Sequence, residues 1–65
     1  MKNDVTGYVY DVDTYNVVAE IVGSQTDVEG YVDANYGDDY ALTYSPAFGF
    51  SGGLTDNDDK DIIYL

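Results

Sequence analysis

The chain of 65 residues contains no cysteine and no histidine. It can therefore form neither a disulfide nor an ordinary zinc site, and its stability must come from packing. The same absences remove the usual nucleophiles and general bases of enzymes. Paired carboxylates can hydrolyse a glycosidic bond, but such an enzyme needs a sugar-binding cleft, for which a chain this short has little room. The sequence therefore predicts a protein without catalytic activity and without a cofactor.

Basic residues are almost as scarce. Lys2 and Lys60 stand against 13 acidic residues, which gives a net charge of -11. A chain this anionic cannot neutralise phosphate groups, so direct binding to nucleic acid or to an anionic membrane surface is excluded. Charge of one sign opposes folding through self-repulsion, but it accelerates association with cationic partners.

Long apolar runs are also absent. The N-terminal residues 1–4 lack the apolar segment of a signal peptide, and no run approaches the length of a membrane span. These features predict a cytoplasmic protein. Apolar residues still make up 45% of the chain, and tyrosine alone occupies eight positions, which is enough for a compact core. We expect one small acidic domain over residues 1–65.

Alternating runs rich in Val and Tyr predict strands at residues 6–12 and 17–23. The polar residues 13–16 between them suit a turn, so the two strands are expected to form an antiparallel hairpin. Strand character returns at residues 39–44. Residues 62–65 are expected to form either a tail or a last edge strand.

A short helix is predicted between the second and third strands. Ser24 or Thr26 can cap its N-terminus, and Thr26 and Glu29 have the spacing of a capping box. Gly37 stands where the helix is expected to stop. Apolar residues recur at helical intervals within these limits and form one inward stripe: Val28, Tyr31, Val32 and Tyr36.

The element order β-β-α-β, followed by the tail or edge strand, predicts a small α+β domain. Its antiparallel sheet of three or four strands would carry one helix packed on one face. Four small apolar residues are assigned to the outer sheet face: Val9, Val18, Val22 and Ala41. A half-apolar face needs a cover, so either a second subunit or the C-terminal segment lies over it. The protein is accordingly expected to be a monomer or a homodimer, and the covering residues of the segment would be Phe48, Phe50, Ile62 and Leu65.

Several acidic residues are placed against the needs of folding. Glu29 and Asp33 form a like-charge pair one turn apart on the predicted helix. Asp38 and Asp39 follow its C-terminus, where the helix dipole disfavours negative charge. Placements that oppose the fold are more often functional than accidental. Solubility and adaptation to high salt are the alternative explanations for the acidity.

Asp11 and Asp13 are expected to share one face of the first strand. Tyr36 lies next to a turn and to acidic residues, and tyrosine is favoured at protein interfaces because it adds contact area at a low entropy cost. The predicted partner-binding residues are therefore Asp11, Asp13, Glu29, Asp33, Tyr36, Asp38 and Asp39.

A rigid array of carboxylates without cations presents the charge of a nucleic-acid backbone, and its natural target is the basic groove of a nucleic-acid-binding protein. In size, charge and aromatic content the whole chain resembles the small acidic DNA-mimic proteins of phages and mobile elements, which include many anti-CRISPR proteins. The resemblance implies an inhibitor that acts by occupancy. Its targets would be a CRISPR surveillance complex, a restriction enzyme or another host factor that binds nucleic acid.

Two other functions stay open from the sequence. The chain can be an acidic interaction or accessory domain that carries no inhibitory activity. Residues 56–61 also have some of the alternating oxygen ligands of a calcium loop, through Asp56, Asp58 and Asp61. The glycine that such a loop needs at its sixth position is missing, so no metal site is predicted, and a solvated acidic loop is expected instead.

Overall fold

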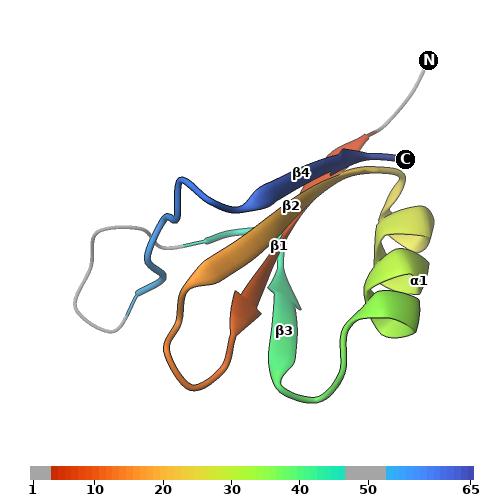
Figure 1. Ribbon diagram of the computed structural model, residues 1–65. Helices are drawn as coiled ribbons and strands as arrows, with labels where there is room; N and C mark the ends of the chain where they lie inside the picture. The colour runs from red at the N-terminus through yellow and green to blue at the C-terminus, as the bar shows by residue number, and fades with distance from the viewer. Residues whose placement is uncertain (1–3, 47–52) are drawn as a thin grey trace.

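The computed structural model describes residues 4–46 and 53–65. Its strands form one four-stranded sheet in the order β3-β1-β2-β4. The helix α1 packs on one face of this sheet, against β1 and β2 (Figure 1). The predicted α+β fold, with one helix on a small sheet, is confirmed. The elements are β1 (Val5–Asp11), β2 (Val17–Gly23), α1 (Gln25–Asn35), β3 (Tyr40–Thr43) and β4 (Asp61–Tyr64).

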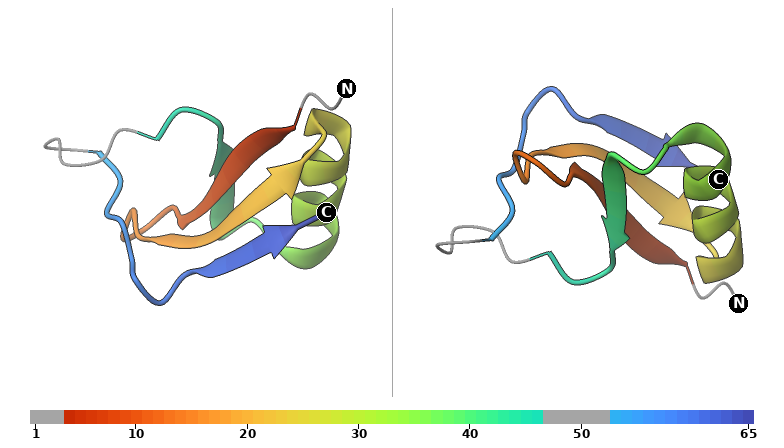
Figure 2. Two further views of the ribbon diagram at one scale, coloured as in Figure 1. Left: turned by 90° about the horizontal axis from the view of Figure 1, so that it is seen from above. Right: turned by 90° about the horizontal axis from the view of Figure 1, so that it is seen from below.

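The direction of β4 differs from the prediction of a purely antiparallel sheet. β1 pairs antiparallel with both β2 and β3, whereas β4 runs parallel to β2, with Ile21 opposite Ile63. Two strands can be parallel neighbours only if a long connection returns the chain to the same end of the sheet. Here that connection contains α1 and β3. Figure 2 shows β4 beside β2, on the side of the sheet away from β3.

The turn between β1 and β2 is built by Asp11. Its Oδ1 accepts hydrogen bonds from the backbone N–H groups of Asp13 at 2.7 Å and of Thr14 at 3.3 Å. Tyr15 closes the turn in the left-handed region, with φ of 62°, and its N–H donates to the Asp11 carbonyl at 2.8 Å. β1 therefore ends at Asp11, because the Asp11 side chain bends the backbone there. The prediction that Asp11 and Asp13 share a strand face is wrong.

The core lies between α1 and the sheet, where Val9, Ala19, Ile21 and Val28 are fully buried. Gly7 allows the helix to come this close. A Cβ atom at Gly7 would lie 2.6 Å from Cγ1 of Val28, a distance that real Cβ contacts essentially never show. The small residues of β1 therefore face the helix.

One assignment to the outer sheet face is thus wrong, because Val9 is fully buried in the core. Val18, beside the irregularity in the β1–β2 pairing, is half-buried and packs against the core cluster. The sequence pattern could not separate the two faces of β1, since tyrosine and valine alternate along it and both are apolar enough to face a core.

The start of α1 is capped by Ser24, whose Oγ accepts a hydrogen bond from the backbone N–H of Asp27 at 3.2 Å. Ser24 is therefore the cap, and the predicted capping box of Thr26 and Glu29 is wrong because Thr26 already lies inside the helix. The predicted stripe is confirmed: Val28 is buried, and three partly buried residues pack against the core, namely Tyr31, Val32 and Tyr36. Among the described residues, no helix is long and apolar enough to cross a membrane.

The C-terminal residues extend the sheet and do not fold over its outer face. Ile62 pairs with Glu20 and Tyr64 pairs with Val22, and these two β4 side chains are 54% and 76% exposed. Leu65 lies against Gly23, where an added Cβ atom would come within 3.0 Å of the Leu65 Cβ. The predicted cover by Ile62 and Leu65 is therefore wrong. The same prediction for Phe48 and Phe50 concerns residues outside the described ranges.

Candidate functional site: an acidic groove beside the helix

A groove of about 400 Å³ runs between the C-terminal half of α1 and strand β3. We call it the acidic groove, because three of its wall residues are carboxylates. It brings together four of the seven predicted partner-binding residues, which the helix and the following loop hold along one side. Its walls are formed by Glu29, Val32, Asp33, Tyr36, Gly37, Asp38, Tyr40 and Leu42.

Two tyrosine rings form the aromatic part of this groove. The rings of Tyr36 and Tyr40 meet edge to face, with their centroids 5.5 Å apart. Tyr36 is half-buried and packs against the core, whereas Tyr40 is 37% exposed. Burial raises the pKa of Tyr36 above its ordinary value of 10.0, and the neighbouring Tyr31, Asp61 and Tyr40 raise it further. The Tyr36 hydroxyl is therefore neutral at physiological pH.

The three carboxylates of the groove have different surroundings. Glu29 Oε2 accepts hydrogen bonds from Gln25 Nε2 at 3.2 Å and from the Tyr44 hydroxyl at 3.3 Å. Burial first, and then the nearby Glu29, raise the pKa of Tyr44 above 10.0. Asp33 and Asp38 are exposed, and within the described residues their side chains accept no hydrogen bond and form no ion pair. Two of the three groove carboxylates are thus open to a binding partner.

The other predicted acids lie at one end of the sheet, next to the groove. The Asp39 carbonyl accepts a hydrogen bond from the Val12 N–H at 3.0 Å. This bond joins the loop after α1 to the β1–β2 turn, and Figure 1 shows both loops at the same end of the molecule. Asp13 and Asp39 are exposed there, whereas Asp11 is half-buried and its carboxylate holds the turn. The Asp11 carboxylate therefore has mainly a structural role, which is to hold the β1–β2 turn.

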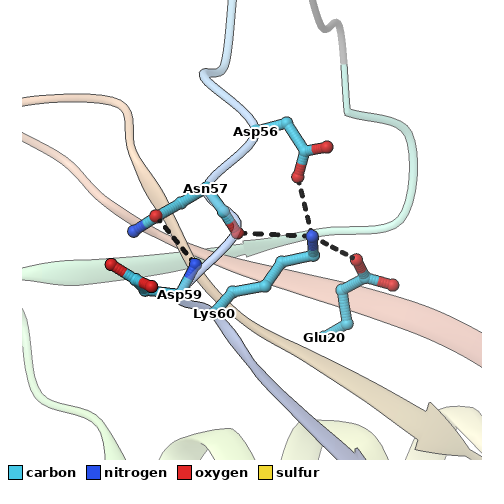
Figure 3. A network of polar contacts seen from close by, with 5 residues as sticks. All are labelled: Glu20, Asp56, Asn57, Asp59 and Lys60. Atoms are coloured by element: carbon cyan, nitrogen blue, oxygen red, sulfur yellow. Dashed lines mark hydrogen bonds and ion pairs between the residues drawn. The ribbon is translucent and has the colours of Figure 1, made fainter.

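A different arrangement surrounds Lys60, the one basic residue within the described ranges. Its Nζ lies 2.8 Å from Asp56 Oδ1 and 3.3 Å from Glu20 Oε2, and it donates a further hydrogen bond to the Asn57 carbonyl (Figure 3). The Lys60 side chain is only 13% exposed. The hydrogen bond that Lys60 donates to Asp56 is the main cause of its raised pKa. We call this cluster the Lys60 network.

The Lys60 network argues against a calcium loop at residues 56–61. Asp56 would be a ligand of that loop, but its carboxylate is engaged by the ammonium group of Lys60. Across residues 4–46 and 53–65, no three acidic side chains gather closely enough to hold a metal ion. The described residues therefore give the calcium alternative no support.

Most acidic side chains of the molecule are thus exposed and form no ion pair within the described residues. All 13 acidic residues lie within the described ranges, and Lys60 forms ion pairs with two of them, Glu20 and Asp56. The remaining eleven form no ion pair in this part of the chain. All of these except Asp11 are exposed. The surface therefore carries fixed negative charge with little internal compensation.

A second, smaller hollow of about 240 Å³ lies beside the β1–β2 turn. It contains no carboxylate, and its aromatic part is the edge-to-face pair of Tyr10 and Tyr15, with centroids 6.0 Å apart. The two hollows therefore differ in charge and not in aromatic character. The walls of the second hollow are formed by Tyr10, Tyr15, Thr43, Ser45, Pro46, Gly53 and Leu54.

Sequence reasoning misses two parts of the site. The sequence places Tyr40 and Leu42 on a strand face, and only the pairing of β3 with β1 shows that they form the wall opposite α1. The sequence also predicts a solvated loop where the Lys60 network lies, although the spacing of four residues between Asp56 and Lys60 is a usable signal. Comparisons with known protein families, with curated proteins and with solved structures gave no match for this chain.

Proposed function

We propose that this protein is an inhibitor that occupies the cationic nucleic-acid-binding site of another protein. Its carboxylates would take the places of backbone phosphates and pair with Lys and Arg side chains of the target. One observation carries the proposal: eleven of the 13 acids form no ion pair within the described residues, and ten of those eleven are exposed. A surface of this kind weakens the fold through self-repulsion, and a cationic partner that covers it would relieve that repulsion.

The target class follows from the charge and from the resemblance of the whole chain to acidic DNA mimics. A host defence protein with a basic groove fits, and a CRISPR surveillance complex is the first to test. Restriction enzymes and other DNA-binding factors of the host form the second group. Inhibition would require no chemistry and no cofactor, because occupation of the groove is sufficient to exclude DNA or RNA.

The experiment is a displacement assay. A purified CRISPR surveillance complex and a purified restriction enzyme are each loaded with a fluorescent DNA duplex, and this protein is titrated in at one fixed salt concentration. Fluorescence anisotropy reports release of the duplex. We expect release from at least one target, and we expect the required concentration to rise steeply with salt, since the contact is between opposite charges.

Two variants test whether the positions of the charges matter. The groove variant combines Glu29→Gln, Asp33→Asn and Asp38→Asn. The control variant removes the same charge from exposed carboxylates outside the groove, through Asp4→Asn, Asp58→Asn and Asp59→Asn. We expect the groove variant to lose about tenfold or more in affinity and the control variant about threefold or less.

Each result has a definite meaning. Equal losses for the two variants would show that total charge alone drives binding, and the acidic groove would lose its special role. Failure of the parent protein to release the duplex from any target would reject nucleic-acid mimicry for these targets. An acidity that serves solubility or salt adaptation would then be the better explanation.

A further inference from the structure

The acidic groove has an apolar floor beneath its acidic rim. Val32 comes from α1, Tyr36 caps the C-terminus of this helix, and Leu42 comes from β3; all three are partly buried and pack against the core. Tyr40 adds an aromatic wall that is 37% exposed. A groove built in this way offers two kinds of contact at once, because apolar and aromatic surface lies within reach of carboxylates. An array of carboxylates alone would offer only charge.

The chain supplies no cation to this groove from the described residues. The last turn of α1 contains no basic residue, although the partial negative charge of a helix C-terminus favours one there. Lys60 is bound to Glu20, which pairs with Tyr8 and Ile62 on the sheet face away from α1. The negative end of the helix, Asp33 and Asp38 therefore add up to an uncompensated negative field at the groove.

We infer that the acidic groove binds an arginine side chain of the partner protein. This inference rests on the proposed function and specifies the contact that the partner makes. A guanidinium group is planar, it stacks on aromatic rings, and it donates in pairs to carboxylate oxygens. The groove presents Tyr40 for stacking and Asp33 and Asp38 for the paired hydrogen bonds. The methylene groups of the arginine would lie against Val32 and Leu42.

Other occupants fit the groove less well. A lysine ammonium is compact and strongly hydrated, so it gains less from an aromatic wall and an apolar floor than a guanidinium does. A second copy of this chain cannot supply the group, because the sequence contains no arginine and carries a net charge of -11. The occupant must therefore come from a different, basic protein.

The test uses three capped peptides of one design, with a central arginine, lysine or citrulline between glycines and one lysine near each end. The arginine and lysine peptides carry the same charge, and citrulline keeps the shape of arginine without its charge. The full chain labelled with ¹⁵N is titrated with each peptide. Amide chemical shifts give both the location of binding and the affinity.

We expect the arginine peptide to bind about fivefold more tightly than the lysine peptide and at least about tenfold more tightly than the citrulline peptide. The shifts should concentrate at the amides of Asp33, Gly37 and Tyr40. Tyr40→Leu should reduce the preference for arginine over lysine to less than about twofold. Tyr40→Phe keeps the ring and should retain the preference, as should Tyr64→Leu, which removes an exposed tyrosine from β4.

Several results would overturn the inference. Equal affinity for the arginine and lysine peptides, with shifts in the groove, would show a general cation surface and would leave the proposed function intact. Shifts outside the groove, or no binding of any peptide, would remove the groove as the arginine site, and the displacement assay would judge the proposed function independently. If Tyr40→Leu does not fold, the pair Asp33→Asn and Asp38→Asn replaces it, and retention of tight arginine binding would then reject the inference.

Discussion

The Lys60 network and the acidic groove use the same kind of side chain, a carboxylate, in opposite ways. In the network, Glu20 and Asp56 share one ammonium group, and the side chains of Glu20 and Lys60 are largely shielded from solvent (Figure 3). In the groove, Asp33 and Asp38 are exposed and have no counter-charge among the described residues. Within the described residues, the carboxylates next to β4 pair with a lysine of the same chain, whereas the groove carboxylates pair with no cation.

This difference separates acids that stabilise the fold from acids that oppose it. Removal of charge should therefore have opposite effects on stability in the two regions. It should lower the stability of the fold at the Lys60 network and raise it at the groove. Solubility alone does not require such a division, because any exposed acid serves solubility equally well.

The largest effect on stability is expected from Lys60→Gln. This change leaves Glu20 and Asp56 without a cation next to the β2–β4 pairing, so it should lower the melting temperature more than any substitution in the groove changes it. Lys60→Arg keeps the charge and should retain most of the stability. Thermal unfolding followed by circular dichroism measures both. An unchanged melting temperature for Lys60→Gln would show that the network is not part of what stabilises the fold.

A smaller effect is expected from salt. The melting temperature of the parent protein should rise between about 20 mM and about 300 mM sodium chloride, because screening weakens repulsion among the eleven carboxylates that form no ion pair within the described residues. The groove variant should show a weaker dependence, since it has lost three of those charges. A melting temperature that is flat or falls over this range would contradict the assignment of net repulsion.

The groove variant should itself be slightly more stable than the parent at low salt. Loss of the repulsion between Glu29 and Asp33 alone is worth about 0.2–0.5 kcal/mol, which corresponds to a rise of roughly 1–4 °C in the melting temperature. The side-chain amide that Glu29→Gln introduces still has an oxygen to accept the hydrogen bonds from Gln25 and Tyr44. A clear loss of stability would mean that the groove acids contribute to the fold, and the contrast with the Lys60 network would fail.

The smallest effect concerns alkaline pH. Tyr36, Tyr44 and Lys60 all have pKa values raised in the folded protein. A raised pKa means that protonation of the group stabilises the folded state. This stabilisation is complete below the pKa values of the unfolded chain, 10.0 to 10.5, and it is lost as the pH rises through the higher pKa values of the folded state. Tyr44→Phe removes one such group, and its melting temperature should fall less steeply between about pH 10 and about pH 11. Identical slopes would show that Tyr44 does not contribute.

The helix is predictable because its signals are local. Ser24 at its start and the stripe from Val28 to Tyr36 both follow from spacings of three or four residues along the chain. The hairpin of β1 and β2 is predictable for the same reason. The bend at Asp11 is not, because it depends on one side chain that accepts hydrogen bonds from the backbone two and three residues later.

The acids of the site can be selected from the sequence, but the shape of the site cannot. The sequence selects Glu29, Asp33, Tyr36 and Asp38, and the structure places them on one groove. The opposite wall depends on the register that sets Leu42 against Val9, which is a contact between residues far apart in the chain. The parallel direction of β4 is equally non-local, since its apolar residues have the same pattern in either direction.

The parallel pairing of β4 also sets the order in which the sheet can assemble. β1 and β2 meet through a short turn, whereas β4 must find β2 across α1, β3 and the segment after them, and the entropy lost in closing a loop grows with its length. We therefore expect β4 to be the last strand to join the sheet and the first to leave it. Each departure would free Lys60 from Glu20, uncover the core beneath Ile63 and leave one edge of β2 unpaired. The least stable part of this small protein is therefore expected at the β2–β4 pairing, at the edge of the sheet opposite β3.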